Sequence, residues 1–478
     1  MKGIIPAGGQ ATRLGPLAAY VSKVLVSIGG RPQLINLVEQ MRRAGCDDIV
    51  VVTSPDTDTQ VRSVIERSGL ERVKTAVQGS PSGPMRAIGI GMAAVYDNID
   101  CPMMVIMADT YINEELPNSE FIGVSTGGSE RNWCYSPVDK FVDGRPDQKT
   151  QVFVGAFRLN SMAESFLVAQ RHIHDNGMAE FLNEFSDVQR VHLASWQDVG
   201  DVLALGKARR ERFISRAHHR LVLDDTGMIT KIGCTEQEAE FMCDLNRSYD
   251  ATRACLFPRV YEVKQGPTSC QYTMDYIDLP SLAELWLYWP GLPETWAGIV
   301  QSVVERCKRD LWTEQGFGTV GDTYKFYGEK AVTRLASYLN SPIDSATNNL
   351  VVNACEIIRA DTWVNGHGDL NFTNILYSLN TNNIKLIDPR GGRVPVSYEY
   401  AKLACSHMIS SIMHGLTNVK RDAEQEAVLS VLHKYIEPNR LKACMALTML
   451  AAASLHKKDE AYRFYQYGMQ LLQEVTQQ

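Results

Sequence analysis

The segment His367-Gly-Asp-Leu-Asn-Phe-Thr-Asn374 is followed, after a short gap, by Ile387-Asp-Pro389. A kinase catalytic loop needs an Asp that accepts the proton of the acceptor hydroxyl, an Asn five positions later that binds Mg²⁺, and a second, chelating Asp beyond a short hairpin. Asp369, Asn374 and Asp388 have this spacing. They predict a phosphoryl-transfer centre in which Asp369 is the catalytic base and Asn374 and Asp388 hold the metal.

Gly368 narrows this interpretation. In protein kinases the position between the His and the Asp holds an Arg that interacts with a phosphate of the activation loop. The Gly at this position therefore indicates a small-molecule kinase. The string resembles the aminoglycoside phosphotransferase and choline kinase family, which uses a protein-kinase-like fold on small acceptors. The resemblance implies a two-lobed domain over residues 209–478, with a small lobe at about 209–278 and a large lobe at about 279–478.

A lysine on a strand of the small lobe is the next requirement, because it holds the α- and β-phosphates of ATP when a carboxylate of the following helix pairs with it. Residues 221–231 read as two strands around a turn, and Lys231 ends the second one. The helix expected next carries three glutamates. The family tends to show Glu-Ala followed by apolar residues, so the resemblance favours Glu238 as the partner, with Glu240 second.

Other segments of this half carry weaker signals. Met274 lies in the expected last strand of the small lobe, near the hinge that would meet the adenine. Residues 215–219 stand where a phosphate-covering loop belongs, but they contain no glycine. Arg390 has two interpretations, a contact to the acceptor or a phosphate, or a buried structural ion pair. Residues 398–403 resemble the continuation of the large lobe, and residues 425–473 have the apolar spacing of helices.

The N-terminal part of the chain carries a different signal. Residues 3–14, GIIPAGGQATRL, read as a short apolar strand that runs into a glycine turn and then a basic residue. Backbone N–H groups exposed by such a turn form an anion-binding concavity that suits a nucleoside triphosphate. This predicts nucleotide contacts at Gly8, Gly9 and Thr12 and a catalytic role for Arg13. The pattern is neither a Walker loop nor a Rossmann dinucleotide fingerprint.

Residues 22–32, with the helix predicted after them, supply the resemblance for this half. They are similar to the Pro-Lys-x-Leu…Gly-x-Pro segment and first helix of the nucleotide-sugar pyrophosphorylases, which join a sugar 1-phosphate to a nucleoside monophosphate. The resemblance implies an α/β fold with a Rossmann-like (GT-A-like) nucleotidyltransferase domain at residues 1–208, and it places Lys23 on the family's phosphate-contacting lysine. Ala11 replaces the usual third glycine, and Ser22 replaces the usual proline.

Nucleotidyl transfer needs Mg²⁺ to neutralise the attacking phosphate and the leaving pyrophosphate, so two carboxylates must converge from different strands. Residues 103–109 are an apolar strand that ends in Asp109 at the carboxyl edge, where α/β sheets bind ligands. A cap on the next helix is the alternative role of Asp109. Residues 196–200, WQDVG, resemble the family's Trp-x-Asp-x-Gly, which implies that Asp198 is the second ligand.

The same resemblance assigns three more residues. Gln78 begins a segment that matches the loop that reads the base and the substrate. Lys140 stands where the family has Glu-Lys-Pro, which implies a contact to the substrate phosphate, and Gly155 falls on the strand that lines the sugar site. Residues 48–53, DIVVVT, are a near-continuous apolar run and predict a buried parallel strand.

Length and composition fit two enzymes in one soluble chain. The 478 residues leave room for about two or three domains, and 45% hydrophobic with 22% charged residues is ordinary globular usage. The net charge of −7 argues against nonspecific nucleic-acid binding. The 11 cysteines form no Cys-x-x-Cys pair, which favours reduced thiols in a cytosol. Because the sequence shows neither a signal peptide nor a bilayer-spanning apolar stretch, a cytoplasmic protein without membrane partners is expected.

Together the two halves predict consecutive reactions. A kinase that phosphorylates a hydroxyl would feed a nucleotidyltransferase that consumes the phosphomonoester, with ATP and a second NTP as substrates and Mg²⁺ in both domains. The leading hypothesis is a sugar 1-kinase joined to a sugar-1-phosphate nucleotidyltransferase for surface-polysaccharide or cell-wall synthesis. The alternatives are a choline kinase with a cytidylyltransferase, or one domain that is an inactive sensor or binding module. The acceptor, the base and the oligomeric state, including a homo-oligomer, stay open.

Overall fold

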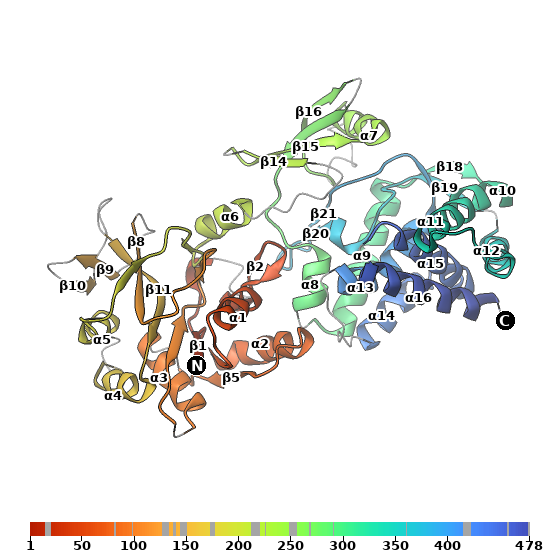
Figure 1. Ribbon diagram of the computed structural model, residues 1–478. Coiled ribbons are helices and arrows are strands. Elements are labelled where there is room, and N and C mark those ends of the chain that lie inside the picture. Colours follow the sequence, from red (N-terminus) through yellow and green to blue (C-terminus); the bar gives the residue numbers. More distant parts are fainter. Residues whose placement is uncertain are drawn as a thin grey trace. The chain divides into compact units, whose positions relative to one another are not determined.

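Apolar runs in the N-terminal part of the chain form the middle of a nine-stranded sheet in the computed structural model (Figure 1). β1 (Lys2–Pro6) pairs in parallel with β4 (Asp48–Thr53) and with β6 (Met103–Ile106), and β4 pairs in parallel with β5 (Val73–Val77). The residues of β1, β4 and β6 are almost all buried, as expected for parallel strands covered on both faces. The buried parallel strand predicted at residues 48–53 is therefore confirmed.

Two compact units, Met1–Phe213 and Ile214–Gln478, divide the chain. The predicted boundary after residue 208 lies inside α6 (Val202–Glu211). Leu205 of α6 is buried in one cluster with Val26, so this helix packs onto the N-terminal segment.

The structure describes residues 1–14, 21–80, 83–97, 99–126, 133–136, 140–143, 151–172, 177–211, 220–224, 226–247, 256–266, 269–289, 291–359, 361–413, 422–456 and 458–476. The glycine-free segment at residues 215–219 lies outside these ranges.

The other strands of the first unit extend the sheet beyond β6. β11 (Gln151–Leu159) runs antiparallel to β6, and it also pairs with β8 (Phe121–Thr126) and β9 (Trp133–Ser136). A bulge between Phe153 and Phe157 shifts its register against β8. The remaining strands of this unit are β10 (Lys140–Asp143), β12 (Arg190–His192), and the short pairs β7 (Thr110–Tyr111) with β13 (Gln197–Asp198) and β2 (Ser27–Ile28) with β3 (Arg31–Pro32).

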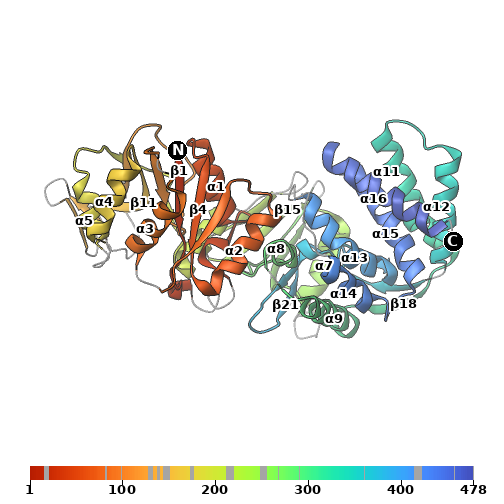
Figure 2. The same cartoon turned by 90° about the horizontal axis from the view of Figure 1, so that it is seen from below.

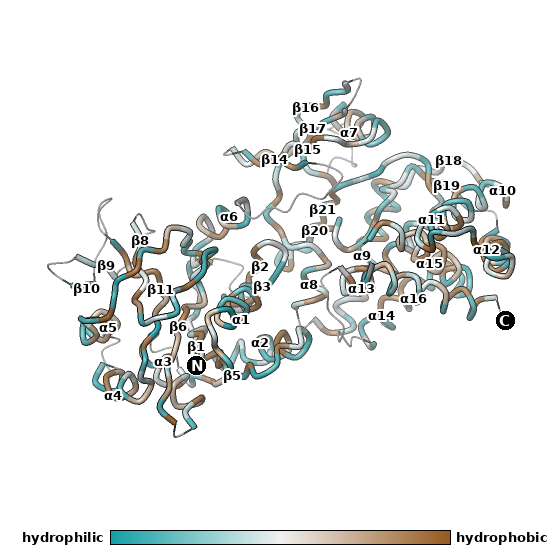
Figure 3. The backbone as a smooth tube through the Cα atoms, in the orientation of Figure 1, coloured by the Kyte–Doolittle hydropathy of each residue, from teal (hydrophilic) through white to brown (hydrophobic). Residues whose placement is uncertain are grey.

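Helices connect these strands and cover the sheet. α2 begins at a clear signal, because Ser54 and Thr57 form a reciprocal capping box and Pro55 takes the first helical position. α3 packs across β1 and β4, and its Ile88 joins Ile4 in the main apolar core, which follows the central strands (Figure 3). The helices of this unit, besides α6, are the 3₁₀ turn η2 (Lys23–Leu25), α1 (Gln33–Arg43), α2 (Pro55–Arg67), α3 (Pro84–Val95), α4 (Met162–His172) and α5 (Met178–Glu184).

The second unit begins with a four-stranded antiparallel sheet in the order β14-β15-β17-β16. β14 (Arg220–Leu223) and β15 (Met228–Cys234) pair as the two strands predicted for residues 221–231, but β15 continues to Cys234, so Lys231 lies within the strand and does not end it. Asp224 shapes the turn between β14 and β15, because its carboxylate accepts hydrogen bonds from the backbone N–H groups of Thr226 and Met228. β16 (Val260–Gln265) and β17 (Cys270–Asp275) complete the sheet, and α7 (Glu236–Arg247) packs against both.

Helices make up most of the rest of the second unit. α15 (Pro438–Ala453) is buried on nearly every face, and α11, α13 and α16 pack around it (Figure 2). The helical spacing predicted at residues 425–473 corresponds to α14, α15 and α16. No helix in the described ranges is long and apolar enough to cross a membrane. The other helices are α8 (Leu282–Tyr288), α9 (Pro293–Asp310), α10 (Val320–Thr323), α11 (Glu329–Leu339), α12 (Ser345–Ile358), α13 (Val396–Met413), α14 (Asp422–Leu432) and α16 (Lys458–Thr476).

Short strands and turns hold the segment that contains His367. β19 (Thr362–Asn365) leads into it and lies between β18 (Thr313–Phe317) and β22 (Arg393–Pro395). The segment then passes through a 3₁₀ turn, η5 (Phe372–Asn374), into the hairpin of β20 (Ile375–Tyr377) and β21 (Ile384–Leu386). The hairpin places residue 388 next to the preceding loop, as the catalytic-loop spacing predicts.

Candidate functional sites

The two aspartates predicted as metal ligands of the first unit lie beside each other. Asp109 immediately precedes β7, and Asp198 ends β13, which pairs with β7 so that Asp198 is opposite Thr110. The backbone N–H of Val199 donates to the carbonyl of Asp109 at 2.9 Å. Both aspartates are buried. The short β7–β13 ladder therefore brings together two carboxylates that are far apart in the sequence.

Lys23 pairs with one of these carboxylates. It begins the turn η2, and its ammonium forms an ion pair with the Asp109 carboxylate. In the described ranges no three or more His, Cys, Asp or Glu side chains form a metal-binding group. Mg²⁺ is usually bound through one or two carboxylates together with substrate phosphates, so the donor set of Asp109 and Asp198 fits Mg²⁺ that arrives with a nucleotide.

The glycine turn after β1 lies close to Gln78. A Cβ on Gly8 would lie 2.6 Å from Gln78 Oε1, so a larger residue at this position would have to displace the end of the Gln78 side chain. Gln78 is buried, and its backbone N–H donates to the Thr53 carbonyl at 2.7 Å. Ala11 has a φ of +51°, in the left-handed region. This conformation disfavours a side chain, which explains why the similar family has a glycine at this position.

The remaining predicted residues of the first unit occupy different places. Thr12 and Arg13 are exposed. Gly155 has a φ of +82°, and a Cβ there would lie 2.3 Å from Thr110 Oγ1, so Gly155 lets β11 approach the residue after Asp109. Lys140 begins β10, which β9 and β11 separate from β6 in the sheet. Lys140 therefore lies away from the Lys23 and Asp109 cluster.

Lys231 is the centre of the second site. The Lys231 ammonium forms ion pairs with the carboxylates of Glu238 in α7 and of Asp388 after β21. Glu238 is fully buried and also accepts a hydrogen bond of 2.8 Å from the Tyr272 hydroxyl, whereas Glu240 is exposed. Glu238 rather than Glu240 is thus the carboxylate that meets Lys231. Met274 lies buried in the neighbouring strand β17.

Arg390 lies next to this ion-pair cluster. Its guanidinium nitrogens are 4.0 Å from carboxylate oxygens of both Glu238 and Asp388, and its backbone N–H donates to the His367 carbonyl at 2.7 Å. Asn374 is buried, and its Nδ2 donates to the backbone carbonyl of Asp369 at 2.9 Å. Asn374 Oδ1 accepts a hydrogen bond of 3.3 Å from the Thr373 hydroxyl. An amide oxygen and a carboxylate, as Asn374 and Asp388 offer, are ligand types that suit Mg²⁺.

Asp369 pairs with a lysine that the sequence analysis did not assign. Lys402 Nζ lies 2.8 Å from Asp369 Oδ1, and Asn371 Nδ2 donates to the same oxygen at 3.0 Å. Burial opposes ionisation of Asp369, but the Lys402 ammonium outweighs burial and holds the pKa of Asp369 well below its ordinary value. Asp369 is therefore a carboxylate at neutral pH and can accept a proton.

His367 and Glu399 hold the loop around Asp369. Burial lowers the pKa of His367 to about 4, so its neutral ring donates from Nε2 to the Ile387 carbonyl at 2.9 Å and accepts at Nδ1 from the Asp369 N–H at 3.2 Å. The Glu399 carboxylate accepts from the N–H groups of Gly368 at 2.8 Å and His367 at 3.2 Å. Glu399 and Lys402 are three residues apart on α13 and share one helical face. This spacing in residues 398–403 is the signal that could have identified them.

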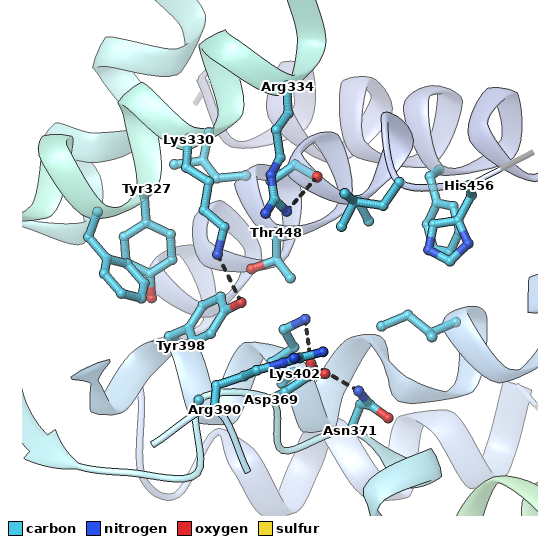
Figure 4. A pocket seen from close by; sticks show the side chains of 18 of the residues that line it. Tyr327, Lys330, Arg334, Asp369, Asn371, Arg390, Tyr398, Lys402, Thr448 and His456 are labelled. Atoms are coloured by element: carbon cyan, nitrogen blue, oxygen red, sulfur yellow. Dashed lines mark hydrogen bonds and ion pairs between the residues drawn. The ribbon is translucent and has the colours of Figure 1, made fainter. Parts of the chain in front are cut away.

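A cavity of about 680 Å³ opens beside Asp369 (Figure 4). Its walls come from α11, α13, α15 and the π-helical turn η4 (Tyr324–Gly328) together with the Asp369 loop. π-helical turns are rare and often occur at functional sites. Arg390, which was predicted to contact the acceptor or form a structural ion pair, both lines this cavity and lies beside the ion-pair cluster.

Comparison with known proteins bears on the first unit. Residues 2–120 match the family model described as nucleotidyl transferase. Over 94 residues the chain is 37% identical to a glucose-1-phosphate thymidylyltransferase of Neisseria gonorrhoeae, and the aligned segment covers 19% of this chain and 32% of the relative. Over 143 residues the chain is 41% identical to a mannose-1-phosphate guanyltransferase of Pichia angusta, and the aligned segment covers 29% of this chain and 38% of the relative. The N-terminal region is thus a homologue of the sugar-phosphate nucleotidyltransferases.

The extent of these matches is limited. The chain spans about a third of the length of the curated relatives that it matches. Among solved structures, a CTP:phosphocholine cytidylyltransferase from Streptococcus pneumoniae shares 17% sequence identity, with a TM-score of 0.36, and the match covers 44% of this chain and 97% of that chain.

Proposed function

We propose that the chain is a bifunctional enzyme. The second unit phosphorylates a hydroxyl of a small, sugar-like acceptor with ATP, and the first unit joins the resulting phosphomonoester to a nucleoside monophosphate from a second NTP. The product is an NDP-linked building block for surface-polysaccharide or cell-wall synthesis. The observation that carries this proposal is that each unit holds its own lysine and carboxylate centre, Lys23 with Asp109 and Lys231 with Asp388.

In the first unit, a phosphate oxygen of the phosphomonoester attacks the α-phosphorus of the NTP, and pyrophosphate leaves. Lys23 supplies positive charge next to the reacting phosphates, and the N–H groups of the turn at Gly8 and Gly9 favour a bound anion. Asp109 and Asp198 would hold Mg²⁺, which neutralises charge on the attacking phosphate and the leaving pyrophosphate. The match to nucleotidyl transferases over residues 2–120 supports this half of the proposal.

In the second unit, the acceptor oxygen attacks the γ-phosphorus of ATP while Asp369 accepts the hydroxyl proton, and ADP leaves. The Lys402 ammonium keeps Asp369 ionised before the reaction. Lys231, held by Glu238, would position the α- and β-phosphates. Asn374 and Asp388 would hold Mg²⁺, which neutralises charge on the transferred phosphoryl group. The convergence of these six side chains supports a kinase more than an inactive binding module, which would need none of them.

A coupled assay tests the proposal on the intact chain. Free acceptor, ATP, Mg²⁺ and the correct NTP are expected to yield the NDP-linked product, and the phosphorylated intermediate should accumulate when that NTP is omitted. Mass spectrometry of a panel of sugars and small alcohols with CTP, UTP, GTP and dTTP measures both species. If every acceptor phosphorylated by the second unit were inert toward all four NTPs, the coupled pathway would be wrong.

A further inference from the structure

The cavity beside Asp369 is strongly cationic. Four basic side chains line it, Lys330, Arg334, Arg390 and Lys402, whereas Asp369 is the one carboxylate among the described residues that form its walls. Lys402 pairs with Asp369 at 2.8 Å, and Arg390 lies 4.0 Å from Asp388. These two cations are therefore balanced by carboxylates of the site already described. Lys330 and Arg334 are the two other basic residues of the cavity wall, and their role is a separate question.

Lys330 and Arg334 are one turn apart on α11, so they lie on the same helical face. Figure 4 shows both side chains entering the cavity from the wall opposite Asp369. Their contacts are with neutral groups, since Lys330 Nζ lies 3.5 Å from the Tyr398 hydroxyl and Arg334 donates to the Ala451 carbonyl at 3.1 Å. In the described ranges neither forms an ion pair, so no carboxylate balances these two neighbouring, half-buried cations.

Thr448 adds an independent polar group to this wall. It lies on α15, lines the cavity and is 5% exposed. Its Oγ1 is buried and has no hydrogen-bond partner among the residues that the structure describes. A buried hydroxyl without a partner costs about 1–3 kcal/mol, so a ligand group that bonds to it would gain affinity. Lys330, Arg334 and Thr448 together offer an ammonium, a guanidinium and a hydroxyl to one ligand.

We propose that this cavity binds an acceptor that carries an anionic group, a carboxylate or a phosphate, as well as the reacting hydroxyl. Lys330, Arg334 and Thr448 bind the anion, and the hydroxyl lies at Asp369. The assignment of the hydroxyl rests on the kinase function proposed above, whereas the anion site rests on the cavity itself. A volume of about 680 Å³ suits a small molecule such as a sugar acid or sugar phosphate.

The same geometry disfavours choline as the acceptor. A quaternary ammonium is bound through the faces of aromatic rings. The aromatic faces of this cavity already meet a cation, because Lys330 Nζ lies 5.6 Å from the centre of the Phe326 ring and 5.2 Å from that of the Tyr398 ring. A second cation in this place would be repelled by Lys330 and Arg334.

Kinetics on the full chain test the acceptor class. ADP formation is measured with D-glucuronate, D-glucose 6-phosphate, D-glucose and choline, and an anionic member is expected to have the highest kcat/KM. Arg334→Gln and Lys330→Gln should each raise the KM for that anion about tenfold, the loss of one charged hydrogen bond, with kcat less affected. Arg334→Lys should recover part of the loss. Lys325→Gln is the matched control, because Lys325 is exposed on η4 and does not line the cavity.

Ligand binding separates this inference from the kinase proposal. Inorganic phosphate and D-glucuronate should raise the Tm of the wild type and of Lys325→Gln, and raise it less in Arg334→Gln. Such a difference without turnover of any acceptor would support the anion site and contradict the kinase. Phosphorylation of choline or D-glucose with a KM unchanged by Lys330→Gln and Arg334→Gln, or equal protection by phosphate in Arg334→Gln and the wild type, would overturn the anion site.

Discussion

The two units each place a lysine on an aspartate that was predicted to bind metal, but they do so in different surroundings. Lys23 comes from a short 3₁₀ turn, and its side chain is 16% exposed where it meets Asp109. Lys231 comes from the middle of β15, and its side chain is 3% exposed between Glu238 and Asp388. The first pair joins a turn to the segment between β6 and β7, and the second pair is more deeply buried.

This difference in burial predicts that the two centres lose different amounts of unfolding free energy when a charged residue is replaced. Removal of one partner of a buried ion pair leaves an uncompensated charge, and the cost to the fold falls as the pair becomes more accessible to water. The first centre should therefore lose less stability than the second when its lysine is replaced.

The largest effect is expected from Asp369→Asn. The amide keeps the side-chain shape but cannot accept the hydroxyl proton, so ATP-dependent phosphorylation should fall about 1,000-fold. Pyrophosphate release from a supplied phosphomonoester and NTP should be unchanged, because it depends on the first unit. Parallel ADP and pyrophosphate assays measure both, with the exposed Asp422→Asn as a control. Loss of both activities in a folded variant would contradict two separate centres.

Asp109→Ala tests the same separation from the other side. The substitution removes one of two predicted anionic metal ligands, and charge stabilisation of this kind is worth several kcal/mol. Nucleotidyl transfer should fall about 100-fold or more, while ADP formation stays within the range of the wild type. Asp187→Ala, an exposed residue of the same unit, is the control. Full nucleotidyl transfer by Asp109→Ala would place the metal elsewhere.

Lys231→Met and Lys23→Met compare the two surroundings directly. Lys231→Met removes the ammonium that meets both the Glu238 and the Asp388 carboxylates and leaves Arg390 4.0 Å from each, so the second unit should lose about 3 kcal/mol of unfolding free energy. Lys23→Met should cost the first unit less, about 1–2 kcal/mol, because it takes the cation from one buried carboxylate, Asp109, rather than from two, and because Lys23 is partly exposed. Calorimetry measures the transitions of both variants. Equal losses would show that the depth of the lysine does not decide its structural role.

Ala11→Gly is expected to have the smallest effect and to increase stability. The φ of +51° at Ala11 disfavours a side chain, so glycine should stabilise the first unit by about 1 kcal/mol. The comparison is Ala44→Gly, at a φ of −80°, where glycine should destabilise. The Tm of each variant measures the effect. A lower Tm for Ala11→Gly would mean that this turn does not carry the strain.

Local spacing explains why much of both sites could be predicted. Lys231 and Glu238 lie on a strand and the helix directly after it, so their pairing follows from a short connection. Asp369 and Asn374 belong to one loop. Asp109 follows a buried strand that ends at the carboxyl edge of the sheet. In each case a few consecutive residues determine which side chains can meet.

The sequence by itself therefore determined the two sets of chemical groups, since their order along the chain encodes local geometry. Tertiary structure alone decided which distant helices complete them. Lys402 and Glu399 reach the Asp369 loop from α13, and Lys330 and Thr448 line the same cavity from α11 and α15. No spacing in the sequence relates these helices. Their contacts arise from the burial of apolar faces around α15, and the polar residues that line the cavity do not encode those contacts.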